Sequence, residues 1–165
     1  MTTDPNTRDN AGVIAPPPLI ALAAVLIGLA LDWLLPAYLL TLLLSLTERI
    51  VIGVILVAAG AWLGITAIRV FTSVGTHVEP WKPSTALATG GIFNRLRNPM
   101  YVGLAFLVGG IGIALASDWT LVMLVAAALT LHFGVVKREE RYLAAKFGEP
   151  YRQYMKTVPR YGWPL

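Results

Sequence analysis

Four long apolar stretches, separated by polar segments, dominate the hydrophobic pattern of this chain. They cover residues 19–35, 50–70, 100–116 and 119–136, and each holds at most one charged residue. A helix of about 17 residues rises roughly 25 Å, close to the thickness of the hydrocarbon core of a bilayer. The pattern therefore predicts an all-α integral membrane protein with about four transmembrane helices.

The polar segments set the boundaries of a single domain. Residues 1–15 are mostly polar, so we expect a disordered N-terminal tail, and residues 16–165 form one membrane domain. A signal peptide is the competing interpretation of residues 19–35. No basic segment precedes them and no small-residue cleavage site comes before Pro36, so we favour a true span.

Short polar turns predict how the helices begin and connect. Only Ser117 and Asp118 separate the last two apolar stretches, which predicts a tight helical hairpin with Asp118 capping its second helix. Thr47 is a plausible N-cap for the second apolar stretch. Helical character continues from the fourth stretch to Phe147, so the last helix should project two or three turns beyond the membrane.

Composition supports a membrane protein and excludes several chemistries. Charged residues make up 13% of the 165 positions, against about a quarter in soluble domains. Cysteine is absent, which excludes disulfides and cysteine-ligated metals, and the two histidines lack metal-binding spacing. The sequence shows no P-loop, no dinucleotide-fold glycine pattern and no serine-hydrolase elbow.

The basic residues lie at the ends of apolar stretches. The net charge is +4, but no basic stripe forms on a soluble face, so anionic lipid headgroups are the expected counterions and nucleic acid is not. Twelve of the 13 lysines and arginines fall on the side of the two termini, and only Arg49 lies opposite. The positive-inside rule then places both termini in the cytoplasm, at the inner membrane if the chain is bacterial.

Two polar clusters flank the predicted hairpin. The first, termed the Gly90 cluster, is residues 90–103, G-G-I-F-N-R-L-R-N-P-M-Y-V-G, and the second, termed the Lys137 cluster, begins K-R-E-E-R. Antiparallel helices bring both clusters to one face of the membrane, which predicts a ligand site. A solvated, self-neutralising helix turn is the alternative for Glu139 and Glu140. For His132, in an apolar stretch, packing and function are both open.

Three sequence blocks stand out in residues 90–160: R-L-R-N-P-M-Y-V-G (95–103), E-E-R-Y-L (139–143) and F-G-E-P-Y-R-Q-Y-M-K-T-V-P-R (147–160). Their order and spacing resemble the membrane methyltransferases of the isoprenylcysteine carboxyl methyltransferase and phospholipid methyltransferase group. That group shows R-H-P-x-Y-x-G, then E-E-x-x-L, then F-G-x-x-Y-x-x-Y with a valine-proline close. The first two apolar stretches match only as generic membrane helices.

The resemblance implies an S-adenosylmethionine site built from residues 88–103 and 137–160. Carried over by position, its cofactor-binding residues would be Gly90, Gly91, Ile92, Asn98, Pro99, Tyr101, Gly103, Glu139 and Glu140. Carboxylates suit a cofactor that bears a sulfonium and an ammonium. Asn98 replaces the usual histidine of the group, and an asparagine keeps hydrogen bonding but cannot carry a proton.

The implied acceptor is lipophilic: an isoprenylcysteine-like carboxylate, a phospholipid amine or a small thiol. Arg138 is the candidate for orienting an anionic acceptor, and His132 is the candidate intramembrane base. Two alternatives stay open, a nicotinamide-dependent membrane reductase of the sterol reductase type, which carries related signatures, and a non-enzymatic small membrane protein. The sequence does not indicate the oligomeric state.

Overall fold

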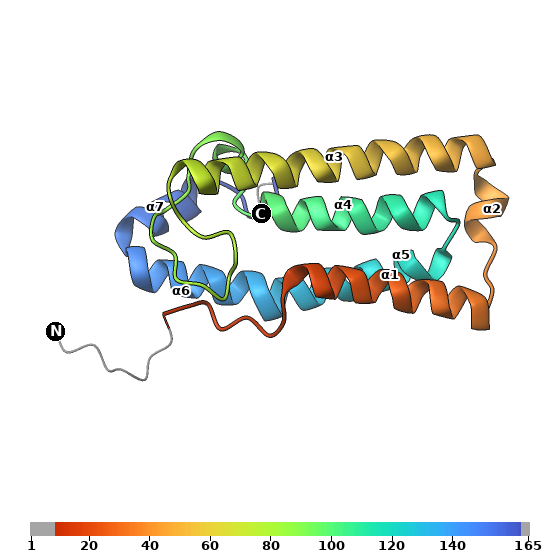
Figure 1. Ribbon diagram of the computed structural model, residues 1–165, viewed down its shortest axis with the longest axis horizontal. Helices are drawn as coiled ribbons and strands as arrows, with labels where there is room; N and C mark the ends of the chain where they lie inside the picture. Colours follow the sequence, from red (N-terminus) through yellow and green to blue (C-terminus); the bar gives the residue numbers. More distant parts are fainter. Residues whose placement is uncertain (1–8, 163–165) are drawn as a thin grey trace.

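The structure, a computed structural model, describes residues 9–162, and the regular elements in this range are all helical (Figure 1). The body consists of α1 (Pro17–Leu34), α3 (Leu46–Ser73), α4 (Pro99–Ala114) and α5 (Asp118–Leu131). α5 continues through a π-helical turn, η2 (His132–Val136), into α6 (Lys137–Phe147). The shorter elements are α2 (Leu39–Leu43), η1 (Gly91–Asn94) and α7 (Glu149–Thr157).

Three helices are long and apolar enough to cross a membrane: Pro17–Leu34, Leu46–Ser73 and the continuous helix Asp118–Phe147. In the third, the apolar sequence ends at residue 136, and the polar α6 extends beyond it. α4 is also apolar, but with 16 residues it is shorter. These helices confirm the all-α integral membrane protein; the four-span topology and its orientation stay predictions.

The helix bundle has two different ends (Figure 1). The long connection between α3 and α4, residues 74–98, lies at one end together with α6 and α7. α2 and the α4–α5 turn lie at the other end. The hairpin of α4 and α5 therefore brings the start of α4 beside η2 and α6, as its short turn predicted.

Glycines allow α3 and α4 to pack with their backbones in close contact. A Cβ atom on Gly60 would lie 2.6 Å from the carbonyl oxygen of Gly103, and one on Gly110 would lie 2.7 Å from that of Gly53. A side chain at either position would force the two helices apart, so the absence of a Cβ permits this approach. A Cβ on Gly64, in contrast, would meet nothing within 4 Å.

The N-cap predicted for α3 is wrong. Ser45, and not Thr47, caps this helix: its hydroxyl accepts a hydrogen bond from the Glu48 backbone N–H, and the Glu48 carboxylate accepts one from the Ser45 backbone N–H. This capping box satisfies two backbone donors at once. It therefore outcompetes Thr47, which lies inside the helix.

The N-cap predicted for α5 is also wrong, because Asp118 is committed to α2. The Asp118 carboxylate accepts hydrogen bonds from the backbone N–H groups of Leu39 at 2.9 Å and Leu40 at 3.0 Å. Ser117 caps α5 instead, with its hydroxyl accepting from the Thr120 N–H at 3.1 Å. Asp118 thus fastens α2 to the hairpin turn.

The N-terminal segment, residues 9–15, makes defined contacts with α6. The Asp9 carboxylate lies 2.7 Å from Lys146 Nζ, and Arg138 Nη1 donates to the Gly12 carbonyl at 2.8 Å. These contacts describe where the segment lies, and the disorder of the N-terminal tail stays a prediction. The rest of that tail falls outside the described residues.

Candidate active site

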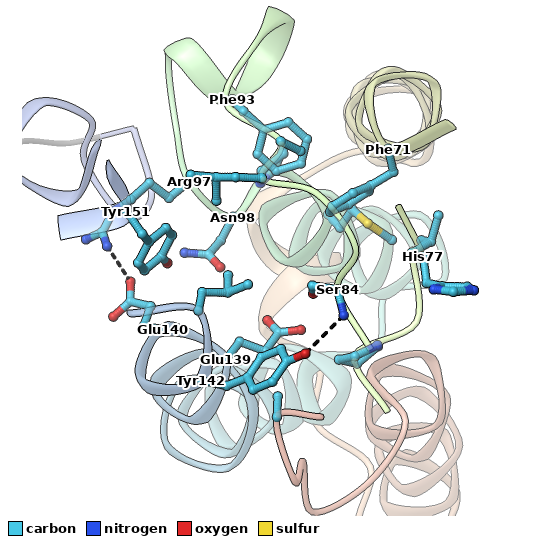
Figure 2. Close-up of a pocket in the computed structure, with 18 of the residues that line it drawn as sticks. Phe71, His77, Ser84, Phe93, Arg97, Asn98, Glu139, Glu140, Tyr142 and Tyr151 are labelled. Atoms are coloured by element: carbon cyan, nitrogen blue, oxygen red, sulfur yellow. Dashed lines mark hydrogen bonds and ion pairs between the residues drawn. The ribbon is translucent and has the colours of Figure 1, made fainter. Parts of the chain in front are cut away.

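A cavity opens between α4, α6, α7 and the long connection, and we term it the polar cavity (Figure 2). The Gly90 cluster supplies Arg97, Asn98 and Tyr101 to its wall, and the Lys137 cluster supplies Glu139 and Glu140. The two polar clusters that the sequence places on one face therefore line a single space. α4 and α6 hold Tyr101, Glu139 and Glu140 on helices, whereas Arg97 and Asn98 lie at the end of the long connection, just before α4.

Glu139 presents a carboxylate to the polar cavity without a cationic partner. The Tyr101 hydroxyl donates a hydrogen bond to Glu139 Oε2 at 2.8 Å. Among the described residues, no lysine or arginine forms a salt bridge with Glu139. Burial raises the pKa of Glu139 to about 7, because removal from water disfavours a charge that no cation compensates. The cavity thus holds an acid that a cationic ligand would ionise and neutralise.

Glu140, the next residue, is fully paired. Arg97 Nη1 lies 2.8 Å from Glu140 Oε1, a pair that Figure 2 shows. Arg160 donates from Nε to Oε1 at 2.9 Å and from Nη2 to Oε2 at 2.7 Å. Because two guanidinium groups occupy its oxygens, Glu140 ties α6 to the C-terminal tail, residues 158–162.

The C-terminal tail also bonds directly to the Gly90 cluster. The Arg97 backbone N–H donates to the Pro159 carbonyl at 3.0 Å, and Asn98 Nδ2 donates to the Arg160 carbonyl at 3.2 Å. Asn98 therefore acts here as a hydrogen-bond donor, a role that requires no titratable group. The tail forms an outer support for the side chains that line the polar cavity.

A second cavity, termed the apolar cavity, lies between α1, α4 and α5 and measures about 560 Å³. Leucine, valine and alanine side chains make most of its wall, and its polar groups are Tyr101, His132 and Tyr161. His132 Nδ1 lies 2.9 Å from the Tyr161 hydroxyl. Tyr101 lines both cavities, so it stands at the boundary between the polar site and the space among the membrane helices.

Some of the predicted cofactor residues come together and others do not. Those that line the polar cavity are Asn98, Pro99, Tyr101, Glu139 and Glu140. The remaining four lie outside its wall: Gly90, Gly91 and Ile92 in the turn at η1, and Gly103 against α3. Gly91 adopts a left-handed backbone with φ of 58°, so a glycine is favoured here by the backbone conformation of the turn.

The two predicted catalytic residues lie apart from each other. His132 faces the apolar cavity, where it meets Tyr161. Arg138 lines neither cavity and holds the N-terminal segment through Gly12.

Sequence reasoning missed an aromatic set around the polar cavity: Phe71, Phe93, Tyr151 and Tyr154. The rings of Phe71 and Phe93 meet edge to face, with centroids 5.1 Å apart. Aromatic rings suit both a planar base and a cation. The third sequence block contains both tyrosines and the Gly90 cluster contains Phe93, so a signal existed for these three residues, whereas Phe71 lies at the end of an apolar stretch with no distinguishing pattern.

A sequence profile of the phospholipid methyltransferase family matches residues 48–150. Two curated relatives are each named protein-S-isoprenylcysteine O-methyltransferase. The one from Schizosaccharomyces pombe is 29% identical over 134 residues, covering 79% of this chain and 55% of the relative. The one from Xenopus laevis is 31% identical over 117 residues, covering 70% of this chain and 41% of the relative. This chain thus spans about half the length of these relatives. No solved structure shows a significant match.

Proposed function

The chain belongs to the phospholipid methyltransferase family, and from this premise we propose that it transfers a methyl group from S-adenosylmethionine to a lipophilic acceptor in the membrane. The observation that carries this proposal is the Glu139 carboxylate, which faces the polar cavity without a cationic partner among residues 9–162. A cationic methyl donor would supply the missing charge.

The side chains that line the polar cavity suit such a donor chemically. When bound, S-adenosylmethionine supplies an electrophilic methyl group on a positively charged sulfur. Glu139 would attract the positive charge of the donor, and the rings of Phe71 and Tyr151 would contact its planar or cationic parts. Glu140 would support the site indirectly, because its ion pairs hold Arg97 and the C-terminal tail in place.

Donor binding requires the polar cavity to open. It measures about 90 Å³, well below the roughly 300–1,000 Å³ that is typical of small-molecule sites. Much of its outer wall belongs to residues 77–88 of the long connection. One tie from this connection to α6 is the hydrogen bond from the Ser84 N–H to the Tyr142 hydroxyl at 3.0 Å. We propose that the connection moves outward to admit the donor.

The apolar cavity suits the hydrocarbon part of the acceptor. Its volume of about 560 Å³ lies within the range of small-molecule sites, and Tyr101 joins it to the polar cavity. Methyl transfer to a carboxylate or thiolate needs positioning without a base, whereas an ammonium must first lose a proton. For an amine acceptor we propose His132 as that base. For Arg138 we propose a role in holding the N-terminal segment.

The comparisons favour neither a nicotinamide-dependent reductase nor a non-enzymatic protein. The names of the two relatives favour an isoprenylcysteine-like carboxylate as acceptor, and the family description favours a phospholipid. The basic residues support an orientation with both termini and the polar cavity in the cytoplasm, where a soluble donor is accessible.

The test is to supply membranes that contain the protein with S-adenosylmethionine labelled in its methyl group. Label in a base-labile ester, a lipid amine or a volatile thioether would identify a carboxylate, amine or thiol acceptor. Membranes with the Glu139→Gln variant at equal abundance are the control and should transfer far less label. Absence of transfer to every fraction, together with consumption of a reduced nicotinamide, would show that the proposal is wrong.

A further inference from the structure

A groove separate from the apolar cavity runs between α6, α7 and the C-terminal tail. It measures about 490 Å³ and is lined by Phe133, Lys137, Glu140, Arg141, Ala144, Met155 and Arg160. The first five of these residues are three or four positions apart or adjacent on one face of a continuous helix. Because three of its residues are cations, we term it the cationic groove.

Two cations of the cationic groove lack a counter-charge. Among the described residues, neither Lys137 nor Arg141 takes part in a salt bridge. Arg141 Nε donates to the Lys137 carbonyl at 3.3 Å, and within residues 9–162 no carboxylate accepts from this side chain. Glu140 does not compensate them, because its oxygens already bind Arg97 and Arg160. The groove therefore carries an excess of positive charge that a bound anion would neutralise.

The cationic groove lies where the apolar part of the helix meets its polar extension. Lys137 is the first residue of α6, and Phe133 lies one turn earlier with 58% of its surface exposed. Lys137 Nζ lies 5.1 Å from the centroid of the Phe133 ring. A cation directly above an exposed aromatic ring at this level matches the boundary between headgroup and hydrocarbon of a bilayer. Met155 extends the apolar wall on the side of α7.

We propose that the cationic groove binds a membrane phospholipid with an anionic headgroup. The phosphate would lie near Lys137 and Arg141, and the acyl chains would follow Phe133 into the bilayer. Charge complementarity selects the headgroup, and the apolar end of the groove selects the attached hydrocarbon. This lipid is distinct from the methyl acceptor, because neither Glu139 nor Tyr101 lines the groove.

The experiment measures which lipids stay with the protein. Full-length protein is reconstituted with equal amounts of phosphatidylglycerol and phosphatidylcholine of identical acyl chains, released into mild detergent, and analysed by native mass spectrometry. We expect preferential retention of phosphatidylglycerol. The Lys137→Gln/Arg141→Gln variant should lower that preference roughly 25-fold, because each cation near an anionic membrane surface contributes about five-fold in affinity.

Two further variants separate the groove from general charge effects. Arg95→Gln/Lys156→Gln removes the same charge from exposed positions outside the groove and should keep the preference. Ala144→Phe fills the groove without a change of charge and should lower it. Three results would each overturn the proposal. The first is equal retention of both lipids by the unmodified protein. The second is a control variant that loses the preference for phosphatidylglycerol as much as the groove variant does. The third is displacement of the bound lipid by excess inorganic phosphate. No methyl donor is added, so the result is independent of the proposed methyl transfer.

Discussion

Replacing Glu140 with glutamine should destabilise the protein by about 3 kcal/mol, whereas the same change at Glu139 should not destabilise it. The side chains of Arg97 and Arg160 that pair with Glu140 are 9% and 23% exposed, and Glu140 itself is 8% exposed. Loss of one partner from a buried pair costs about 3–5 kcal/mol, because the remaining charge stays buried without compensation. The partial exposure of Arg160 places the expected value at the lower end.

Glu139 differs from Glu140 because its ionised form, buried without a cation, lowers the stability of the folded state. Its pKa is raised from 4.5 to about 7 in the folded protein. A carboxyl whose folded pKa is raised lowers stability as pH rises through the interval between the two values, so the loss begins near pH 4.5 and is complete above about pH 7. Glu139→Gln removes this loss, and its stability should therefore lack that fall with pH.

The assay is reversible unfolding in mixed micelles, followed by circular dichroism, at pH 5 and pH 8 for the unmodified protein and both variants. Glu149→Gln is the matched control, since Glu149 forms an exposed pair with Arg152 at 3.9 Å and should change stability by less than about 1 kcal/mol. If Glu139→Gln is as destabilising as Glu140→Gln at pH 8, the assignment of different roles to the two glutamates is refuted.

Three other changes test separate parts of the structure. Gly110→Ala should cost about 1–3 kcal/mol by forcing α4 from α3, whereas Gly64→Ala should be close to neutral, and the same unfolding assay distinguishes them. Asp118→Ala removes two hydrogen bonds to α2 and should cost about 1–3 kcal/mol; hydrogen exchange at Leu39 should increase, and unchanged exchange there would contradict this role. Affinity for S-adenosylmethionine should rise with pH through about 7 as Glu139 ionises, and calorimetry on Glu139→Gln should show no such rise.

The sequence predicted the architecture and the meeting of the two polar clusters because both depend on local rules. Apolar stretches of sufficient length specify membrane helices. The turn between α4 and α5, residues 115–117, is so short that the two helices have little freedom except to lie antiparallel. The hydrogen bond between Tyr101 and Glu139 realises the predicted juxtaposition of the clusters.

The different environments of Glu139 and Glu140 could not be predicted from their own positions. Adjacent residues in a helix point about 100° apart, so the sequence indicates that their surroundings differ but not how. The pairing of Glu140 depends on Arg160, which follows 20 residues later after α7 and a further turn. Only the tertiary structure shows that Glu140 is paired with arginines, whereas Glu139 has no cationic partner among the described residues.

The sequence also predicted the wrong N-cap residues for α3 and α5. Ser45 and Thr47 have similar intrinsic capping ability, and the position of Glu48 three residues after Ser45 decides between them. Asp118 is a good cap by type, yet its carboxylate binds α2, which is distant in sequence. In both helices the N-cap was therefore decided by a hydrogen-bond partner, Glu48 for Ser45 and the backbone of α2 for Asp118.

The most direct test of the central claim is calorimetric binding of S-adenosylmethionine and of its demethylated product, which lacks the positive sulfur, to the protein and to Glu139→Gln. If the Glu139 carboxylate recognises the charge of the donor, the unmodified protein should bind the donor, and the glutamine variant should weaken donor binding more than product binding. Absence of donor binding to the folded protein, or an equal loss for the two ligands in the variant, would contradict the account.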